Sequence, residues 1–282
     1  MFAPDEKAIG AAFSQPENDG TFSGEFGTYL RGIARTRPIV MFAFAPKAAG
    51  TFLRSAAIAA INGQLRRVVH AQGGRDAQPY LPLFIAYYMG ALGDQPLVTH
   101  VHMQALAANR HFVEALDLKP IVMIRSIPDM LASYWDMLDN DPEARQDGLN
   151  CSIPDFFPAM PKGDKADFLI DILGPWYAGY FATWFDYAKE DPERVLLLHY
   201  GEFRRAPALA LEQALRHSGL PKPEVICRAA IDETWKERTL FRFNRGEERR
   251  GRAYFPWRHF DRLARLLSYY PISPDWQSEL LR

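Results

Sequence analysis

Cysteine is scarce in this sequence, and its placement predicts neither a disulfide framework nor a redox pair. Only two cysteines occur, Cys151 and Cys227, and they form no Cys-x-x-Cys pair and no regularly spaced set. A disulfide-stabilised secreted scaffold is therefore disfavoured. We expect a protein of a reducing compartment, which is the cytoplasm.

Long apolar runs and an excess of charge of one sign are missing as well. No apolar run approaches the ~18 residues of a membrane-spanning helix, and residues 1–20 lack the basic start and apolar stretch of a signal peptide. The formal net charge is -1 at pH 7, so no global field favours a nucleic acid or an anionic membrane. We expect neither a nucleic-acid-binding protein nor an integral membrane protein, and any anionic ligand must be held by local groups.

A third absence concerns nucleoside triphosphates. The chain contains no Gly-Lys-Ser and no Gly-Lys-Thr, so it has no Walker A loop. This disfavours a magnesium-dependent kinase or NTPase.

What the sequence does contain is an alternation of apolar runs and helical patterns. Its 282 residues, 48% of them hydrophobic, suffice for a sizeable core, and we expect one domain over residues 1–282. The pattern predicts an α/β doubly wound sheet with central parallel strands flanked by helices, and ligands bind at the carboxyl ends of such strands. The predicted strands are 37–45, 97–102, 120–124 and 195–199, and the helices that follow them are 51–65, 105–116, one from about 128, and 207–218.

Three segments depart from this alternation. Residues 1–36 are expected to form an N-terminal arm. Residues 139–166 are rich in Asp, Pro, Gly and Lys without sustained periodicity, which favours an insertion or lid. A long aromatic helix is expected over 167–189.

The first predicted strand leads into the loop 46–51, PKAAGT. A helix that starts after a strand offers unpaired N–H groups and a partial positive charge, so such a turn can hold a phosphate or sulfate. Lys47 adds a full charge, Gly50 allows close approach of the backbone, and Thr51 supplies a hydroxyl. Alone, the loop predicts an anion site and nothing more specific, since a lysine at a strand end is more often an ordinary solvated residue.

A second polar segment, RSIPDMLASYW, starts at Arg125, directly after the strand 120–124. Ser126 can cap the following helix, and Asp129 and Ser133 share a helix face. An arginine at a strand end and a serine on the next helix can converge on one phosphate.

Together the two segments resemble the donor-binding motifs of the PAPS-dependent sulfotransferase family, of the cytosolic or bacterial type. That family pairs a Pro-Lys-Ser-Gly-Thr-Thr-Trp-like loop for the 5'-phosphosulfate of 3'-phosphoadenylyl sulfate (PAPS) with Arg-x-x-x-Asp-x-x-x-Ser-Tyr for the 3'-phosphate. Here PKAAGTFL and RSIPDMLASYW follow in the same order with the same internal spacing. The resemblance implies a sulfotransferase-like, P-loop-containing fold. It also implies transfer of a sulfuryl group from PAPS, without a metal, to a hydroxyl or amine of a small-molecule or lipid-like acceptor.

Weaker similarities extend the match. Residues 98–101, VTHV, are similar to the family's Lys-Thr-His-Leu, which implies His100 as general base. Tyr200 is similar to a tyrosine near the adenine, and Trp235 to an aromatic residue that stacks on the base. Residues 242–256 resemble the family's Arg-Lys-Gly loop, which closes over the 3'-phosphate. Both Arg245-Gly246 and Arg250-Gly251 fit it, and a solvated basic loop fits equally well.

The resemblance thus implies one catalytic set and one donor-binding set. The catalytic residues are Lys47, His100 and Ser133. The donor-binding residues are Lys47, Ala48, Ala49, Gly50, Thr51, Phe52, Arg125, Ser133, Tyr200, Trp235, Arg245, Gly246 and Arg250.

Four positions depart from the family pattern. Ala49 stands where the family usually has Gly, Gly50 where it has Thr or Asn, and Phe52 where it has Trp. Val98 replaces a lysine, which leaves Lys47 as the one side-chain cation expected at the reacting sulfur.

Some alternatives stay open at this stage. His102 would face the same side of a strand as His100 and is a rival base. The pair has no further ligand at informative spacing, so we expect no metal. A nucleotide or small-molecule kinase and a catalytically silent nucleotide-binding protein of the same fold remain as other functions. The family's dimerisation motif is not identified near the C-terminus, so the sequence assigns no oligomeric state.

Many aromatic residues suit an apolar, aromatic or lipid-like acceptor, although we expect most of them to belong to the core. They are Tyr80, Phe84, Tyr87, Tyr88, Trp135, Phe156, Phe157, Trp176, Tyr177 and Phe181.

Overall fold

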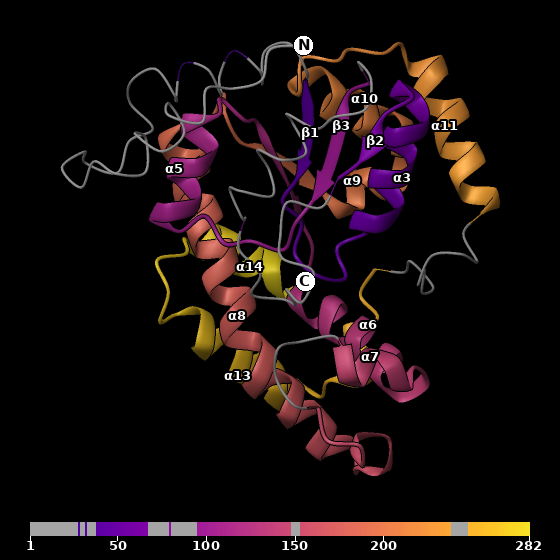
Figure 1. Cartoon of the computed structure of the whole chain (residues 1–282). Coiled ribbons are helices and arrows are strands. Elements are labelled where there is room, and N and C mark those ends of the chain that lie inside the picture. The colour runs from indigo at the N-terminus through magenta and orange to yellow at the C-terminus, as the bar shows by residue number, and fades with distance from the viewer. Residues whose placement is uncertain are drawn as a thin grey trace, which may run out of the picture.

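The computed structural model describes residues 38–66, 95–147, 153–237 and 248–282, together with Thr28, Gly32 and Pro79. These residues form a five-stranded parallel sheet in the order β2-β3-β1-β4-β5 (Figure 1). The predicted doubly wound α/β fold is confirmed. The strands are β1 (Ile39–Phe42), β2 (Gln64–Leu65), β3 (Leu97–His100), β4 (Pro120–Ile124) and β5 (Leu196–His199).

The central strands are apolar because both of their faces are covered. Every residue of β1 and β4 is buried, as expected of parallel strands between two helical layers. Phe42 at the end of β1 lies level with His100 at the end of β3, and Ile124 at the end of β4 lies level with His199. The carboxyl ends of the strands therefore meet along one edge of the sheet.

The order of the strands creates a switch point at the centre of this edge. From β1 the chain moves to β2 on one side, and from β4 it moves to β5 on the other, while β1 and β4 are neighbours. In doubly wound sheets ligands bind in the crevice that such a reversal opens. The candidate site should therefore lie between the ends of β1 and β4.

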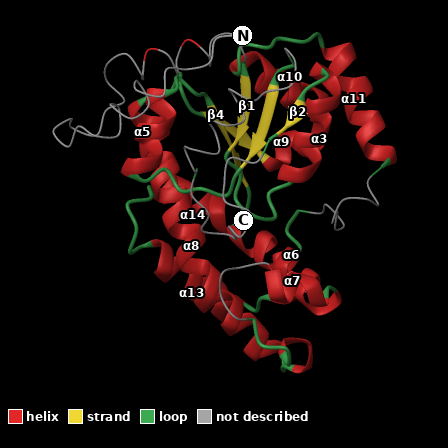
Figure 2. Ribbon diagram, in the orientation of Figure 1, coloured by secondary structure: helices red, strands yellow, loops and turns green. Residues whose placement is uncertain are grey.

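Helices surround the sheet on both sides and extend beyond its carboxyl edge (Figure 2). Helix α3 packs against α11 and α10, whereas α8 packs against α6 and α13. The helices are α3 (Gly50–Ile61), α5 (Ala107–Ala115), α6 (Ile127–Asn140), α7 (Pro142–Asp147), α8 (Lys162–Glu190), α9 (Tyr200–Arg205), α10 (Pro207–His217), α11 (Glu224–Lys236), α12 (Gly251–Tyr254), α13 (Trp257–Leu267) and α14 (Pro274–Leu281), and Phe157–Ala159 form a short 3-10 helix.

Several predicted boundaries were wrong. The strands expected over 37–45 and 97–102 end earlier, at Phe42 and His100, and the helix expected over 105–116 is limited to Ala107–Ala115. The helix expected over 51–65 ends at Ile61, because Asn62 adopts a left-handed conformation with φ 49° and its N–H returns to the carbonyl of Ile58. The next residues form β2 instead. The segment 139–166 is also more regular than expected, since α6 continues to Asn140, α7 follows, and α8 starts at Lys162.

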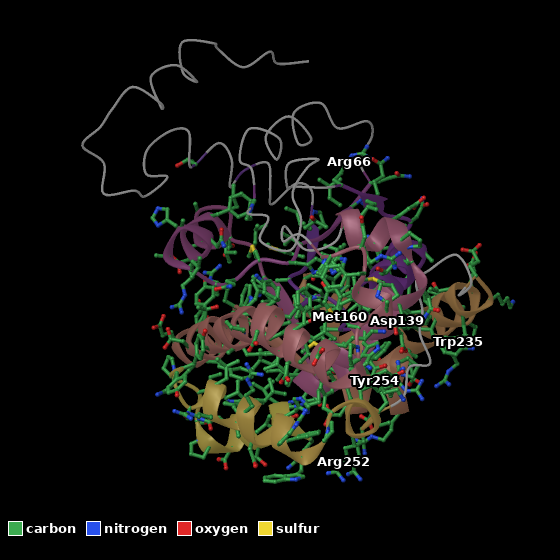
Figure 3. All side chains as sticks on the ribbon, turned by 90° about the horizontal axis from the view of Figure 1, so that it is seen from below. Arg66, Asp139, Met160, Trp235, Arg252 and Tyr254 are labelled. Atoms are coloured by element: carbon green, nitrogen blue, oxygen red, sulfur yellow. The ribbon has the colours of Figure 1, made fainter. Side chains whose placement is uncertain are left out.

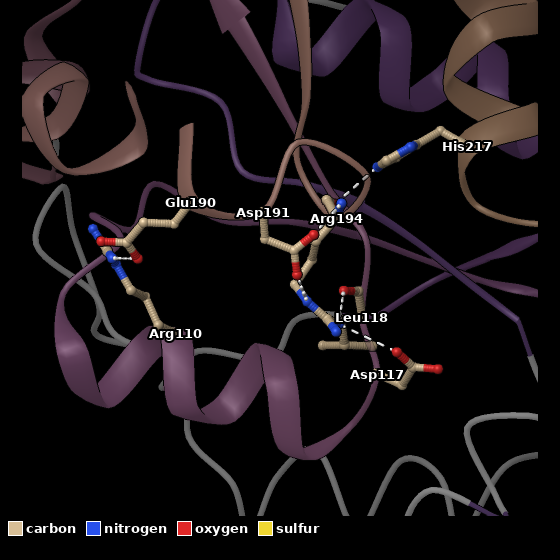
Figure 4. A network of polar contacts seen from close by, with 7 residues as sticks. All are labelled: Arg110, Asp117, Leu118, Glu190, Asp191, Arg194 and His217. Atoms are coloured by element: carbon tan, nitrogen blue, oxygen red, sulfur yellow. Dashed lines mark hydrogen bonds and ion pairs between the residues drawn. The ribbon is translucent and has the colours of Figure 1, made fainter. Parts of the chain in front are cut away.

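Charged side chains secure the opposite, amino edge of the sheet (Figure 4). Arg194, just before β5, binds the carboxylates of Asp191 at 2.9 Å and Asp117 at 3.2 Å, and Asp117 precedes β4. Arg110 joins α5 to the end of α8 through Asp186 and Glu190. This network holds the starts of β4 and β5 together, far from the edge that carries the candidate site.

Of the aromatic residues considered for an acceptor pocket, most described ones belong to the core, as expected. Phe156 is exposed. Buried are Trp135, Phe157, Trp176, Tyr177 and Phe181, while Tyr80, Phe84, Tyr87 and Tyr88 lie outside the described residues.

Candidate functional site

The loop after β1 has the backbone of an anion-binding turn. Lys47 and Ala49 both adopt the left-handed conformation, each with φ 65°. Ala49 is also the N-cap of α3, and no side chain caps this helix. Uncapped N–H groups at a helix start need water or an anion as partner, so the turn suits a phosphate or sulfate group.

Arg125 connects the two predicted motifs directly. It follows β4, is only 7% exposed, and its Nη1 donates a hydrogen bond to the carbonyl oxygen of Lys47 at 2.6 Å. Its guanidinium also lies 4.1 Å from the centre of the Tyr200 ring, a cation–π contact with the residue after β5. The ends of β1, β4 and β5 therefore meet around one arginine.

The side chain of Lys47, from the loop after β1, contacts α6, the helix that carries Ser133. The Nζ of Lys47 is 3.5 Å from the sulfur of Met137 and 6.0 Å from the ring centre of Tyr134, both on α6. Ser133 is four residues before Met137 and thus on the same helix face, and it is 4% exposed. The structure brings these two predicted catalytic residues to one face of α6.

His100 occupies the space that a side chain at position 50 would fill. A Cβ added to Gly50 would lie 2.5 Å from Cε1 of the His100 ring and closer still to its Nε2. That Nε2 is buried and has no hydrogen-bond partner in the described part of the chain. The ring therefore lies against the first turn of α3.

His102 lies next to His100 but is held differently. The two rings are 4.7 Å apart and nearly perpendicular, and Nδ1 of His102 is 2.7 Å from the carbonyl oxygen of Phe44, to which it donates. Burial lowers the pKa of both rings, that of His100 strongly, and the positive charge of Arg54 lowers both further. Both imidazoles are therefore neutral near pH 7, as a general base must be.

The described part of the predicted capping loop docks on the start of α6. Both oxygens of Asp129 accept backbone hydrogen bonds of 2.8 Å, one from the N–H of Arg249 and one from that of Gly251. Gly251 lies so close to Pro128 that an added Cβ would be 2.5 Å from the proline Cβ. This brings the pair Arg250-Gly251 beside the Arg125 segment, while Arg245 and Gly246 lie outside the described residues.

The guanidinium of Arg250 makes an ion pair of its own. It binds the carboxylate of Asp136, which also accepts a hydrogen bond from the hydroxyl of Tyr254. Its Nη1 is nevertheless buried without a hydrogen-bond partner among the described residues. Arg250 thus fastens α12 to α6 and keeps one donor unused.

The two aromatic residues of the predicted donor site differ in exposure. Trp235 is 38% exposed at the end of α11 and lies at the rim of the molecule (Figure 3). Phe52 is buried, and its ring meets that of Trp235 edge to face at 5.5 Å. Phe52 is thus placed to support Trp235, whose exposed ring could stack on a base.

Helix α8 braces the ends of the strands with a row of hydrogen-bond donors that the sequence analysis missed. The Tyr177 hydroxyl donates to the carbonyl of Pro46 at 2.9 Å, the Tyr180 hydroxyl to that of Ala43, and the Trp184 indole to that of Met103 at 2.9 Å. Burial raises the pKa of Tyr180, so its hydroxyl keeps its proton. The signal was the spacing of three and four residues, which places all three on one helix face.

Among the residues that the structure describes, no group of three or more His, Cys, Asp or Glu side chains is arranged to hold a metal ion. No helix in these parts of the chain has the length and apolar character needed to cross a membrane.

Comparison with known proteins identifies the fold. No protein-family model matches the chain, and no curated protein sequence matches it. The structure does match mouse sulfotransferase SULT7A1 complexed with PAP, with a TM-score of 0.64 over 89% of this chain and 91% of that one, at 12% identity. The chain has the sulfotransferase fold.

A retinol dehydratase in complex with androsterone and the inactive cofactor PAP also matches, with a TM-score of 0.47 at 12% identity over 88% of both chains. Within the sulfotransferase fold, the roles of individual residues must come from the geometry of this chain, because so low an identity carries over the fold alone.

Proposed function

We propose that this chain is a sulfotransferase that moves a sulfuryl group from PAPS to a hydroxyl or amine of a small-molecule or lipid-like acceptor. The observation that carries the proposal is the hydrogen bond from Arg125 to the carbonyl of Lys47 at the switch point of the sheet. It joins the segment proposed to hold the 5'-phosphosulfate to the segment proposed to hold the 3'-phosphate. The sulfotransferase fold, seen with PAP in the mouse enzyme, supports the same donor.

The residues present fit this donor. The uncapped start of α3 and Lys47 would hold the 5'-phosphosulfate, and the donor supplies the sulfuryl group. Arg125, Ser133 and the Arg250-Gly251 turn would hold the 3'-phosphate. Trp235 offers an exposed ring for the adenine.

The chemistry needs one base and one cation from the chain. Neutral His100 takes the proton of the acceptor while the acceptor oxygen or nitrogen bonds to sulfur. The bond from sulfur to the 5'-phosphate oxygen breaks, and Lys47 neutralises the charge that builds on that oxygen. A sulfuryl group carries less negative charge than a phosphoryl group, so fixed donors suffice without magnesium.

Calorimetry and a transfer assay test the proposal. The chain should bind the 3',5'-bisphosphate product in preference to ATP, and it should move label from radiolabelled PAPS to a phenol, a sterol or a primary amine. Preference for ATP would indicate a kinase. Bisphosphate binding without transfer to any acceptor or to water would indicate a silent nucleotide-binding protein of this fold.

Variants locate the two ends of the donor. Arg125→Ala should weaken binding of the bisphosphate by about 10- to 100-fold, and it should change binding of an analogue without the 3'-phosphate far less. Equal losses would remove Arg125 from the 3'-phosphate site. His100→Ala should abolish transfer and keep bisphosphate binding, whereas loss of transfer in His102→Ala alone would assign the base to His102.

A cytoplasmic location stays a prediction from the sequence.

A further inference from the structure

Helix α3 carries a cation one turn after the loop that is proposed to hold the donor. Arg54 is four residues after Gly50, so both lie on one face of the helix. Because Cα–Cβ bonds in a helix tilt toward its N-terminus, the side chain of Arg54 covers the turn that contains Gly50. Gly50 has no side chain of its own there, and the His100 ring takes that space.

The charge of Arg54 reaches both histidines. Its side chain is partly buried, with Nε shielded from solvent. Its positive charge contributes to the lowered pKa of both rings, after the larger effects of burial and, for His100, of the neighbouring His102. Lys47, at the other end of the loop, acts on His102 in the same direction. The charge of Arg54 therefore acts on both histidines, and that of Lys47 on His102.

Strand β3 cannot supply a charge at this place. Val98 is fully buried between the neighbouring strands and pairs with Val40 of β1. A lysine there would need a polar partner inside the apolar core. A second cation at the start of α3 must therefore come from elsewhere, and α3 itself carries one at Arg54.

We propose that Arg54 is the second cation of the reaction centre and contacts the sulfuryl oxygens of PAPS during transfer. Arg54 on α3 would thus supply the positive charge that Val98 on β3 cannot supply. The bond from sulfur to the 5'-phosphate oxygen breaks with its electron pair left on that oxygen, and the acceptor gains the sulfuryl group. Arg54 neutralises charge on the sulfuryl side, while Lys47 neutralises the leaving group. The inference rests on the proposed function.

Three variants test it. Arg54→Met keeps the length of the stem and removes the charge, and Arg54→Lys restores a charge. Arg216→Met is the matched control, because Arg216 is an exposed arginine of α10 that pairs with Glu212 one turn away. Each is compared with the wild type in transfer from saturating radiolabelled PAPS to naphthol and to water, in binding of the 3',5'-bisphosphate, and in proton NMR titration of the histidine rings.

The expected result separates a catalytic from a structural arginine. Arg54→Met should lower the transfer rate by about 100- to 1,000-fold, the usual loss for one electrostatic contact to a transition state. It should leave the affinity for the bisphosphate, which lacks the sulfuryl group, within about 3-fold. The pKa of the two histidines should rise in Arg54→Met and not in Arg216→Met, and Arg54→Lys should recover part of the rate.

Results that contradict the role of Arg54 differ from results that contradict the proposed function. An unchanged rate or unchanged histidine titrations in Arg54→Met would overturn the inference while leaving the sulfotransferase proposal intact. So would a parallel loss of bisphosphate binding, or a lysine variant no better than methionine, because these results indicate a structural role. If the wild type binds no bisphosphate, the proposed function fails and this inference fails with it.

Discussion

Gly50 has no side chain, and the ring of His100 from β3 fills the space that a Cβ would take. The residue at position 50 therefore depends on a residue 50 positions away in the sequence. The family that the sequence resembles has Thr or Asn at this place, whereas here the imidazole of His100 lies against Gly50. His100 is itself packed edge to face against His102 and Phe44. The ring therefore cannot simply swing aside to admit a Cβ.

Gly50→Ala should therefore damage both stability and transfer. The new Cβ must displace the His100 ring or the first turn of α3, and such overpacking costs about 1–3 kcal/mol in the free energy of unfolding. Urea unfolding and the transfer assay measure the two effects. The matched control is Gly163→Ala in α8, where the nearest atom to an added Cβ is Nη2 of Arg258 at 3.4 Å, an ordinary contact.

The control should keep full transfer and gain up to about 1 kcal/mol, because alanine favours a helix over glycine. A Gly50→Ala protein with the stability and transfer of the wild type would show that His100 is not held against the loop.

The residues of the site differ in how far the sequence could predict them. The positions of Lys47 in the loop after β1 and of Arg125 directly after β4 followed from apolar runs and from spacing within each motif, and a hydrogen bond joins the two residues. The reason for a glycine at position 50 could not be predicted, because it depends on a ring that comes from another strand. The sequence signals Arg54 only by its spacing of four residues from Gly50, which places both on one face of α3.

At the scale of single elements, α6 contacts both halves of the candidate site. Its first turn holds the backbone of the Arg249–Gly251 turn through Asp129, and its middle carries Ser133 and the residues beside Lys47. Farther along, Asp136 binds Arg250 and Tyr254. A change in the first turn of α6 should therefore weaken binding of the donor's 3'-phosphate.

Asp129→Asn tests this role. An amide can accept from one of the two N–H groups, but its NH₂ faces the other, so one buried donor loses its partner and both bonds lose the assistance of the charge. We expect a loss of about 1–3 kcal/mol in the free energy of unfolding and bisphosphate binding weaker by about 10-fold. Urea unfolding and calorimetry measure the two quantities.

Asp171→Asn serves as the control for Asp129→Asn. Asp171 pairs with Arg262 between two largely exposed side chains of α8 and α13, and such a pair contributes at most about 1 kcal/mol. This variant should bind the bisphosphate as the wild type does. Normal binding and stability in Asp129→Asn would contradict a role for α6 in holding the turn.

The elements themselves were predictable where the pattern was strong. The apolar run of β4 was located to the residue, because both faces of that strand are buried and its borders are polar. Strand β2 was missed since Gln64 and Leu65 have no strand pattern and are ordered by pairing with β3. Helix α9 was missed as well, since Tyr200 and Gly201 follow a strand without a helix-start signal.

At the scale of the whole molecule, polar groups are divided between two edges of the sheet. The amino edge carries exposed ion pairs around Arg110 and Arg194, which are satisfied within the described chain. The carboxyl edge instead carries the neutral, partly buried histidines His100 and His102, whose pKa values are lowered by removal from solvent. A third histidine, His217, is held neutral at the amino edge by burial, although bonds to backbone carbonyls oppose that shift. Protonation of any of these histidines therefore lowers the free energy of unfolding of the protein.

This arrangement predicts that the protein loses stability in mild acid, at pH values above those at which aspartate and glutamate side chains titrate. Burial lowers the folded-state pKa of His100, His102 and His217, so below the ordinary histidine pKa of about 6.5 the unfolded chain binds more protons than the folded one. The free energy of unfolding should then fall as the pH drops through this value, by up to about 1.4 kcal/mol per pH unit for each histidine, until the folded pKa is reached.

Urea unfolding at about pH 7.5 and about pH 5.5 measures the effect, since aspartate and glutamate side chains ordinarily titrate near pH 4. His100→Gln and His217→Gln each remove one such group, one at each edge of the sheet. Each variant should lose less stability between the two pH values than the wild type does, whatever its stability at the higher pH. If both variants show the full pH dependence of the wild type, these partly buried histidines are not its source, and the neutral state that His100 needs as a base would lose its support.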